Sequence, residues 1–373
     1  MTAPIVIASG GTGGHMFPAI ALAEVLRDRG VPVHVLTDGR GARYLADGWP
    51  CTLIEAGSPT GRPAERLAGA FRLGKGGIQA LNALRGLKPA AVAAFGGYAS
   101  VPPACAARLL GIPVMIHEQN AVLGKANRLV ARFADRIALA FADSRGAERL
   151  SRERVTVTGN PVRPAVAAIR THDYAPPGSG EPIEILVLGG SQGARVLSDV
   201  VPAAIAALPE ALRARVRLVQ QCRPEDLERV TAAYATIDFH AELSAFFADA
   251  PARLARAHLF IGRSGASTIA ELLALARPSV LVPYPFAADD HQRANAQFLA
   301  DQGAASMADQ NGLDEALLAA RLTDLLARPE RLAAMSERAR ALDHADAADR
   351  LADTVLALAA GRDGAMALSR DAA

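Results

Sequence analysis

The sequence predicts two Rossmann-like α/β domains, each a doubly wound parallel sheet, and three observations support this. The chain has 373 residues, which is more than a single hydrophobic core usually serves. Short apolar runs alternate with helical patterns along most of its length, as in successive βαβ units. A glycine-rich turn follows an apolar strand at residues 9–14 and again at residues 189–194. The same plan therefore occurs twice in one chain.

The first domain is expected over residues 1–163. The apolar run PIVIA at residues 4–8 predicts its first strand, and the helical pattern at 17–29 follows directly. Later apolar runs, separated by helical patterns, predict further strands at 31–37, 90–95, 112–117, 135–141 and 154–162. Because each strand is followed by a helix or a polar turn, a parallel sheet is the expected arrangement.

Residues 164–182 are rich in proline and lack clear periodicity, which is typical of an interdomain linker. The second domain is expected over 183–345, with strands in the apolar runs at 183–188, 216–221, 257–262 and 278–283. A C-terminal helix is predicted at 346–361, with the option of packing back on the first domain. Residues 362–373 are predicted to be a disordered tail.

The charge of the chain is unevenly distributed. Residues 1–163 hold 20 Lys and Arg against 11 Asp and Glu, whereas the remaining 210 residues hold 20 against 27. This asymmetry predicts that the first half meets an anionic partner. The chain has only five Tyr and one Trp for base stacking and no nucleic-acid motif, so we expect no nucleic-acid partner. An anionic membrane surface remains the candidate.

Composition also indicates the cellular setting. No apolar run reaches the length of a membrane-spanning helix, and the start of the chain lacks the features of a signal peptide. Three cysteines at unrelated spacings predict reduced thiols rather than a disulfide framework or a zinc site. The sequence therefore predicts a cytoplasmic protein.

The first glycine-rich turn, GGTGGH, has three possible explanations. Gly11 and Gly13 match the first two positions of a dinucleotide fingerprint, and Asp38 stands where an NAD-binding acid would be, but the third glycine position is Met16. A turn chosen only for tightness is the second explanation. The third is a backbone surface that comes close to a polar ligand, because glycines lack Cβ atoms and a helix N-terminus favours negative charge.

His15 ends this turn, at the edge of the expected ligand site. Histidine is the side chain most often used for general-base chemistry near neutral pH, so His15 is our candidate catalytic residue. Ligands of open α/β sheets bind at the carboxyl ends of the strands, and both glycine-rich turns fall there. We therefore expect the two domains to face one interdomain cleft.

Two motifs in the second half repeat this design. GGSQGA at 189–194 is either an ordinary βα turn or a site where Ser191 and backbone amides contact a phosphate. GRSGASTIAEL at 262–272 places Arg263 beside another helix N-terminus. Glu271 lies further along that helix, either as a solvated side chain or within reach of ribose hydroxyls.

The segment YPFAADDHQRANAQFL at 284–299 gathers Asp, His, Gln and Asn side chains at the start of a helix. These groups suit hydrogen bonds to sugar hydroxyls, although N-capping by Asp289 or Asp290 would explain one of them. No spaced pair of aspartates follows a metal-binding pattern, so we expect no metal ligands and no cofactor. In the first half, Asn120 in HEQN and Arg163 in GNPVR also follow predicted strands.

Residues 61–89 form a basic segment with interleaved apolar side chains. Six Lys and Arg stand against a single acid, Glu65. A pair of amphipathic surface helices would explain the pattern, and so would docking on an anionic bilayer.

Seven ordered motifs resemble one bacterial enzyme family. GGTGGHxFPA, GGYxSxP, HEQN, GNPVR, GGSQGA, RSGAxTxxE and a proline-rich DHQxxN segment resemble the undecaprenyldiphospho-muramoylpentapeptide β-N-acetylglucosaminyltransferases, over about residues 4–360. This resemblance implies the GT-B fold and an inverting transfer, without a required metal, from UDP-N-acetylglucosamine (UDP-GlcNAc) to lipid I, giving lipid II. It also implies a peripheral location on the cytoplasmic face of the inner membrane, with residues 61–89 facing the lipid.

The resemblance also implies a set of donor-binding residues in this chain. Glu271 would hold the ribose, Arg163 or the helix at Ala266 the phosphates, and Gln292 and Asn120 the sugar. Phe247 departs from the family pattern, in which an aliphatic residue is common beside uracil. The complete expected set is Thr12, Gly13, Gly14, Asn120, Arg163, Ser191, Phe247, Arg263, Ala266, Ser267, Thr268, Ile269, Ala270, Glu271 and Gln292.

Other functions remain open at this point. Another GT-B transferase or an epimerase acting on UDP-sugars would share most of these motifs. An NAD-dependent dehydrogenase with two domains is disfavoured by Met16. A membrane-recruited protein that binds a sugar nucleotide without catalysis is the third alternative.

Overall fold

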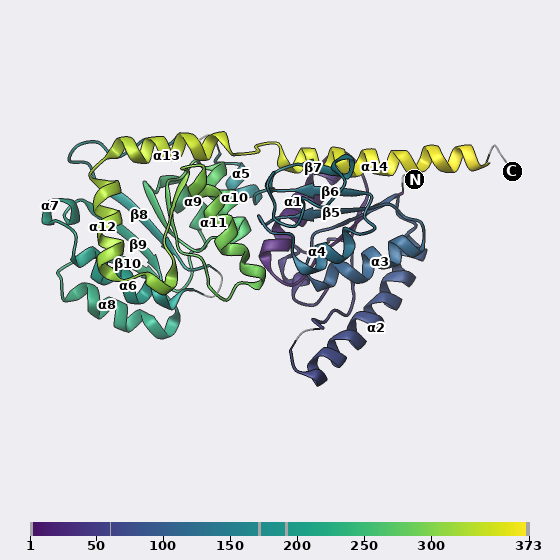
Figure 1. Ribbon diagram of the computed structural model, residues 1–373, viewed down its shortest axis with the longest axis horizontal. Coiled ribbons are helices and arrows are strands. Elements are labelled where there is room, and N and C mark those ends of the chain that lie inside the picture. Colours follow the sequence, from purple (N-terminus) through teal and green to yellow (C-terminus); the bar gives the residue numbers. More distant parts are fainter. Residues whose placement is uncertain (1–2, 60, 171–172, 191–192, 371–373) are drawn as a thin grey trace. The chain divides into compact units, whose positions relative to one another are not determined.

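The computed structural model describes residues 3–59, 61–170, 173–190 and 193–370. It divides the chain into two compact units, the first comprising residues 1–163 and 344–373 and the second residues 164–343. Both are α/β units with helices on the two faces of a parallel sheet (Figure 1). The α/β class and the two Rossmann-like sheets predicted from the sequence are confirmed.

The first unit contains a sheet of seven parallel strands in the order β3-β2-β1-β4-β5-β6-β7. Along the chain the strands are β1 Ile5–Ala8, β2 Val33–Thr37, β3 Cys51–Leu53, β4 Ala91–Ala94, β5 Val114–Glu118, β6 Arg136–Leu139 and β7 Val155–Val157. The helices are α1 Gly13–Asp28, α2 Pro63–Leu87, α3 Val101–Leu109, α4 Lys125–Val130 and α14 Ala347–Arg370.

Side-chain alternation along these strands builds two hydrophobic layers. Ile5 and Ile7 of β1 join α1 and α14 on one face of the sheet. Val6 and Ala8 of the same strand join α2, α3 and α4 on the other face. Because both faces are covered, the central strands β1 and β4 are apolar throughout rather than alternating with polar residues.

The second unit contains a sheet of six parallel strands in the order β10-β9-β8-β11-β12-β13. Along the chain these are β8 Ile183–Leu188, β9 Val216–Gln221, β10 Ala241–Ser244, β11 Leu259–Gly262, β12 Ser279–Leu281 and β13 Ala305–Met307. The helices are α5 Pro164–Ala167, α6 Arg195–Ala206, α7 Glu210–Arg213, α8 Leu227–Ala235, α9 Ala250–Arg256, α10 Ala266–Ala274, α11 His291–Asp301, α12 Glu315–Leu326 and α13 Pro329–Ala341.

The segment expected to be a linker, residues 164–182, belongs instead to the second unit. Val166 of α5 is fully buried, and the Tyr174 hydroxyl donates a hydrogen bond to the carbonyl of His258 at 3.1 Å. The Arg277 guanidinium lies 5.1 Å from the centre of the Tyr174 ring. These buried contacts explain why a proline-rich stretch without periodicity is packed rather than free.

The C-terminal helix returns to the first unit. Leu351, Ala352 and Val355 of α14 are fully buried in the layer that contains Ile5 and Ile7. Arg29 at the end of α1 forms ion pairs with Asp349 and Asp353 of α14.

The helix runs to Arg370, whereas a disordered tail was expected from residue 362. Alanine, leucine, methionine and arginine in this stretch are strong helix formers, and they outweigh the single glycine there, Gly364. No helix among the described residues is long and apolar enough to cross a membrane.

Helix α2 is a single helix of 25 residues rather than the helix pair considered above. The N-terminal half of α2 extends beyond the rest of the first unit (Figure 1). Two of its internal glycines lie where another part of the backbone packs against the helix. A Cβ atom on Gly69 would lie 2.1 Å from the carbonyl oxygen of Ser58, and one on Gly76 would lie 2.0 Å from that of Glu55. The segment before the helix therefore packs directly on its backbone.

Candidate functional site

The strand orders place the glycine-rich turns at the switch points of both sheets. In the first unit, β1 lies between β2 and β4, so the turns after β1 and β4 meet where the winding direction reverses. In the second unit, β8 and β11 are neighbours in the same way. This is the position at which open α/β sheets bind ligands.

The N-terminus of α1 presents backbone N–H groups that no side chain caps. Thr12 is the N-cap residue, but its side chain makes no capping hydrogen bond, and the first turn contains no acidic residue. Thr12 is exposed, and Gly13 and Gly14 are half-buried. A helix end of this kind favours an anionic ligand.

Asp38, which the dinucleotide explanation placed beside a ribose, instead supports the glycine turn. Its Oδ1 atom accepts hydrogen bonds from the backbone N–H of Gly11 at 3.0 Å and of Gly41 at 2.8 Å. Its Oδ2 atom accepts one from Arg40 at 3.2 Å. Burial opposes ionisation, but these N–H donors and Arg40 outweigh it and lower the pKa of the Asp38 carboxyl. The carboxylate is committed to the protein's own backbone.

His15 lies in the first turn of α1, half-buried, between the turns that follow β1 and β4. Its Nδ1 atom is 2.9 Å from the Oε1 atom of Gln119. Gly96 and Gly97 pack against the ring, because Cβ atoms at these positions would lie 3.3 Å from its Cε1 and Cδ2 atoms. Both glycines have positive φ, 82° and 70°, a conformation in which a larger residue would be strained. This glycine pair makes room for the imidazole.

The sequence predicted only Asn120 of the HEQN motif as a site residue, but all four residues of the motif form hydrogen bonds in this region. Glu118 is buried, and its carboxylate accepts hydrogen bonds from Asn120 and from Asn127 of α4. His117 is fully buried, and its Nε2 atom lies 3.0 Å from the carbonyl oxygen of Gly159. Strand alternation was the available signal, because it places His117 and Gln119 on the same side of β5.

Arg163 ends the N-terminal segment of the first unit and lies over an aromatic ring of that unit. Its guanidinium lies 5.3 Å from the centre of the Phe17 ring. The Phe17 ring also meets Tyr44 edge-on, with ring centres 5.5 Å apart. A cation over an aromatic ring in this way is held in place by the attraction between its charge and the ring face.

In the second unit, α10 begins shortly after β11. Its N-cap residue is Gly265, which makes no side-chain capping hydrogen bond. Ser267 and Thr268 in its first turn are partly exposed, and the Ser267 Oγ atom is buried without a hydrogen-bond partner in the described structure. Ile269 has a fully buried side chain, and its backbone N–H donates to Gly265 within the helix. Ile269 is therefore a core residue of this unit.

Other expected residues of α10 lie close to the same turn. Ala266, Ala270 and Glu271 are buried apart from a small exposed fraction of each. Arg263 precedes the helix and donates to the carbonyls of Val282 and Pro283 and to the side chain of Gln310. Burial lowers the pKa of its guanidinium. These contacts give Arg263 a part in supporting the loop after β12.

Gln292 is oriented by the backbone of that same loop. Its Oε1 atom accepts a hydrogen bond from the N–H of Tyr284 at 3.0 Å, so Nε2 is the donor end of this side chain. Asp289 and Asp290 precede it with positive φ values of 54° and 56°. Asp290 is the N-cap residue of α11 but makes no side-chain capping bond, so the N-capping explanation for this cluster is wrong for Asp290.

The remaining expected residues lie near the turn after β10 or outside the described part. The Phe247 ring is buried beneath Arg253, whose guanidinium lies 4.6 Å from its centre. Ser191 lies outside the described residues. Nearby, the N–H of Gly189 donates to Oε1 of Gln221 at 3.0 Å. The described residues contain no cluster of three or more His, Cys, Asp or Glu side chains that could hold a metal ion.

Comparison with known proteins gives a consistent result over nearly the whole chain. Residues 5–139 match the glycosyltransferase family 28 N-terminal domain, and residues 184–351 match the glycosyltransferase family 28 C-terminal domain. One relative is the UDP-N-acetylglucosamine–N-acetylmuramyl-(pentapeptide) pyrophosphoryl-undecaprenol N-acetylglucosamine transferase of Paramagnetospirillum magneticum. It is 53% identical over 364 residues, which cover 97% of this chain and 98% of the relative.

The relative of the same name from Rhodospirillum centenum is 49% identical, covering 96% of this chain and 95% of its own. Among solved structures, Acinetobacter baumannii MurG matches with a TM-score of 0.79 and 33% identity, covering 95% of this chain and 99% of that one. A UDP-N-acetylglucosamine 2-epimerase matches with a TM-score of 0.68 at 15% identity, covering 95% and 96% of the two chains. The epimerase match shows a shared fold alone.

Proposed function

The chain belongs to glycosyltransferase family 28, and from that membership we propose that it transfers N-acetylglucosamine from UDP-GlcNAc to undecaprenyl-diphospho-N-acetylmuramyl-pentapeptide (lipid I), giving lipid II for peptidoglycan synthesis. One observation carries this proposal: relatives named for this reaction are 53% and 49% identical over almost the entire chain. The epimerase alternative is supported only by a likeness of fold.

The proposed reaction is a direct displacement with inversion at the anomeric carbon. A hydroxyl oxygen of the N-acetylmuramyl sugar forms the new bond to that carbon, and the bond from the carbon to the UDP oxygen breaks. UDP leaves with the electron pair, and His15 takes the proton of the attacking hydroxyl. The half-buried imidazole, held between glycine turns at the switch point, supports this role.

The second unit is proposed to hold the donor. The uncapped N-terminus of α10, with Ser267 and Thr268, suits the diphosphate. Glu271 is proposed to accept from ribose hydroxyls, and Nε2 of Gln292 to donate to the sugar. Fixed donors of this kind stabilise the charge that develops on departing UDP. On the first unit, the N-terminus of α1 and the stacked Arg163 are proposed to meet phosphate oxygens.

Helix α2 is proposed to bring the protein to the anionic membrane surface that carries the acceptor. Leu67, Phe71 and Ile78 are 74%, 74% and 65% exposed. At 100° per residue they lie on the face of α2 opposite to the buried Gly69 and Gly76. Exposed apolar side chains of this size are typical of a contact surface.

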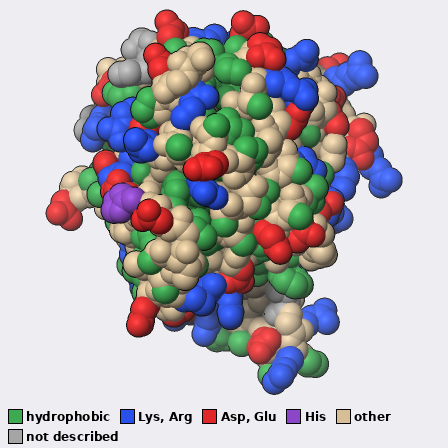
Figure 2. Space-filling model, turned by 90° about the vertical axis from the view of Figure 1, so that its left-hand side faces the viewer, with side chains coloured by type: hydrophobic (Ala, Val, Ile, Leu, Met, Phe, Trp, Pro, Cys, Tyr) green, Lys and Arg blue, Asp and Glu red, His purple; other side chains and the backbone are tan. Residues whose placement is uncertain are grey.

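Basic residues flank this apolar stripe and complete the proposed membrane surface. In Figure 2 the lowest part of the molecule is the N-terminal end of α2, where basic and hydrophobic side chains project together. Such a combination binds the inner leaflet peripherally. Peripheral attachment on the cytoplasmic side is therefore the proposed location.

The test is a reconstituted reaction with the purified full chain, UDP-GlcNAc and a lipid I analogue. Release of UDP and formation of the disaccharide product are measured together. We expect both from the wild type, with His15→Ala reducing kcat by about 10²- to 10⁴-fold while its affinity for UDP-GlcNAc is retained. Hydrolysis or epimerisation of UDP-GlcNAc without disaccharide would refute the proposed function. Unchanged turnover in the His15 variant would refute only the assignment of the base.

A further inference from the structure

Gln119 is buried at the end of β5 with its amide enclosed by hydrogen-bonding partners. The Nε2 atom lies 3.0 Å from the carbonyl oxygen of Phe95, 3.0 Å from that of His117 and 3.1 Å from the Nδ1 atom of His117. The Oε1 atom lies 2.9 Å from the Nδ1 atom of His15. Every polar atom of this side chain is therefore engaged.

These surroundings determine which end of the amide is which. Carbonyl oxygens only accept hydrogen bonds, so the atom that faces two of them must be the NH₂ group. The reversed amide would place its oxygen against both carbonyls. The oxygen of Gln119 therefore faces His15, and because that oxygen is also only an acceptor, the Nδ1 atom of His15 must carry the proton.

His117 supports this orientation of the Gln119 amide through its Nδ1 atom. Its Nδ1 accepts from the Gln119 amide, so its own proton resides on Nε2 and is donated to the carbonyl of Gly159. Burial lowers the pKa of His117 to about 4, with a smaller contribution from the neighbouring His15. His117 therefore stays neutral at physiological pH, and its Nδ1 remains an acceptor for Gln119.

We propose that Gln119 is a positioning residue that holds neutral His15 as its Nδ1–H tautomer, so that Nε2 is the atom that takes the proton from the acceptor hydroxyl. This inference rests on the proposed function. The logic is that of the carboxylate that orients the histidine of a catalytic triad, but the orienting group here is uncharged. An amide sets the tautomer without stabilising the imidazolium as a carboxylate would.

The ionisable groups around the ring are few among the described residues. On β5 they are His117, which is neutral, and Glu118, whose carboxylate accepts from Asn120, Asn127 and the N–H of Gly124. The turn after β4 contributes the glycine pair Gly96 and Gly97. In this environment, the substitution Gln119→Glu introduces a new carboxyl group directly against the His15 Nδ1 atom.

The first test is spectroscopic and needs no substrate. Imidazole nitrogens of the ¹⁵N-histidine-labelled full chain are observed by NMR, and the His15 signals are assigned by their loss in His15→Asn. Above the pH at which the His15 imidazolium deprotonates, we expect a protonated Nδ1 and an unprotonated Nε2. A proton on Nε2 would overturn the proposal, whether or not the protein makes lipid II.

The second test compares two variants kinetically. Gln119→Leu removes the acceptor, so we expect both tautomers by NMR and a fall in kcat on the order of 10- to 100-fold, with an unchanged KM for UDP-GlcNAc. Gln119→Glu keeps an acceptor against Nδ1 and should retain the Nδ1–H tautomer. Its second oxygen replaces the NH₂ group that faces the carbonyls of Phe95 and His117, so we also expect a lower free energy of unfolding. Because a carboxylate favours the imidazolium, its acidic limb of kcat/KM should move upward by about one pH unit, with kcat recovering above that limb.

The pair of variants separates positioning from packing. If Gln119 only filled space and satisfied the two carbonyls, both substitutions would lower activity together at every pH. Equal loss in Gln119→Glu and Gln119→Leu across the pH range would therefore overturn the proposal, as would full activity of Gln119→Leu. If the leucine variant fails to fold, the wild-type tautomer and the glutamate pH profile still decide the question. Failure of the wild type itself to form disaccharide would instead count against the proposed function.

Discussion

The carboxylate of Glu118 holds Asn120 at two points. Its Oε1 atom accepts from the backbone N–H of Asn120 at 3.0 Å and from the side-chain Nδ2 at 3.1 Å. Its Oε2 atom accepts from the N–H of Gly124 and from Nδ2 of Asn127, both at 2.9 Å. One buried side chain therefore organises the loop after β5, and it does so as an acceptor at both oxygens.

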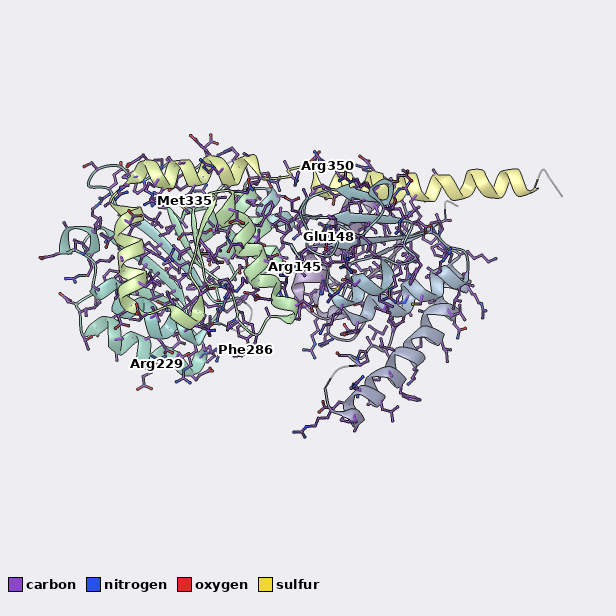
Figure 3. The ribbon with its side chains drawn as sticks, viewed as in Figure 1. Arg145, Glu148, Arg229, Phe286, Met335 and Arg350 are labelled. Carbon is purple, nitrogen blue, oxygen red and sulfur yellow. The ribbon has the colours of Figure 1, made fainter. Side chains whose placement is uncertain are left out.

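Replacing that acceptor should weaken the loop. Glu118→Gln points an NH₂ group at existing donors, so we expect a loss of about 1–3 kcal/mol in the free energy of unfolding and a raised KM for UDP-GlcNAc. Urea titration and steady-state kinetics measure the two effects. The matched control is Glu148→Gln, an exposed residue of the same unit that is labelled in Figure 3. Equal effects of the two substitutions would contradict the prediction.

The basic face of α2 should be required for binding to anionic vesicles. Reversing Arg66, Arg72 and Lys75 to Glu should remove most binding to vesicles rich in anionic lipid, because each basic residue near the surface contributes about 1 kcal/mol. Sedimentation with vesicles at physiological salt measures it. The control reverses the same number of exposed charges elsewhere on the first unit, at Arg108, Arg132 and Arg149. Unchanged sedimentation of the α2 variant would exclude this docking surface.

The carboxylate of Glu271 should make UDP bind more tightly than an analogue that lacks the ribose hydroxyls. Glu271→Gln should weaken UDP binding by about tenfold, since hydrogen bonds to charged groups contribute about 1.5–3 kcal/mol. Binding of a UDP analogue without ribose hydroxyls should change little. Calorimetric titration compares the two ligands, with the exposed Glu228→Gln of the same unit as control. A similar loss for both ligands would assign Glu271 a structural role.

Burial of His117 should make the first unit sensitive to acid. Its pKa is about 4 in the folded protein against 6.5 for the free side chain, so between these values the unfolded chain binds more protons than the folded one. Stability is therefore complete above pH 6.5 and falls by up to about 3 kcal/mol as the pH drops toward 4. His117→Gln, which keeps an acceptor and a donor, should flatten this part of the profile.

The single tryptophan makes that measurement specific. Trp49 packs beside the core layer of the first unit, so its fluorescence during urea unfolding reports that unit. The wild type and His117→Gln are compared at pH 5 and pH 7.5. An equal loss of stability on acidification in both proteins would show that His117 is not the group responsible.

The same fluorescence should reveal the contribution of α14 to the first unit. Leu351→Ala removes a fully buried side chain from the layer that contains Ile5, so we expect a loss of about 2–5 kcal/mol in the free energy of unfolding. Arg350→Ala, one residue away on the exposed side and labelled in Figure 3, should change it little. A silent Leu351 variant would mean that α14 is dispensable for this core.

Local features were predictable from the sequence, and features set by distant contacts were not. The long apolar strands and the glycine turns after β1 and β8 follow from hydrophobic runs and turn chemistry. Strands β3, β10 and β13 were not predicted, because each has only three or four residues and little pattern. Helix α2 continues through Gly69 and Gly76 because residues 55–58, which precede the helix, pack against its backbone at these two positions.

The candidate site shows the same division. His15 and Gln292 could be named because their positions after strands follow from the βα pattern, and Thr12 was named from the family resemblance. The acceptor role of Asp38 toward Gly11 and Gly41 could not, because it depends on how two loops fold together. The contact between His15 and Gln119 joins residues 104 positions apart, and a single sequence contains no signal for such a pair.

The return of α14 to the first unit has a consequence for synthesis on the ribosome. The second unit is one continuous stretch, residues 164–343, while the first is completed only by residues after His344. Domains fold as units while the chain emerges. Most of the first unit is translated before the second unit, but its core helix α14 is translated after it. Until then, the apolar face that will receive Leu351 and Val355 stays uncovered on the nascent chain.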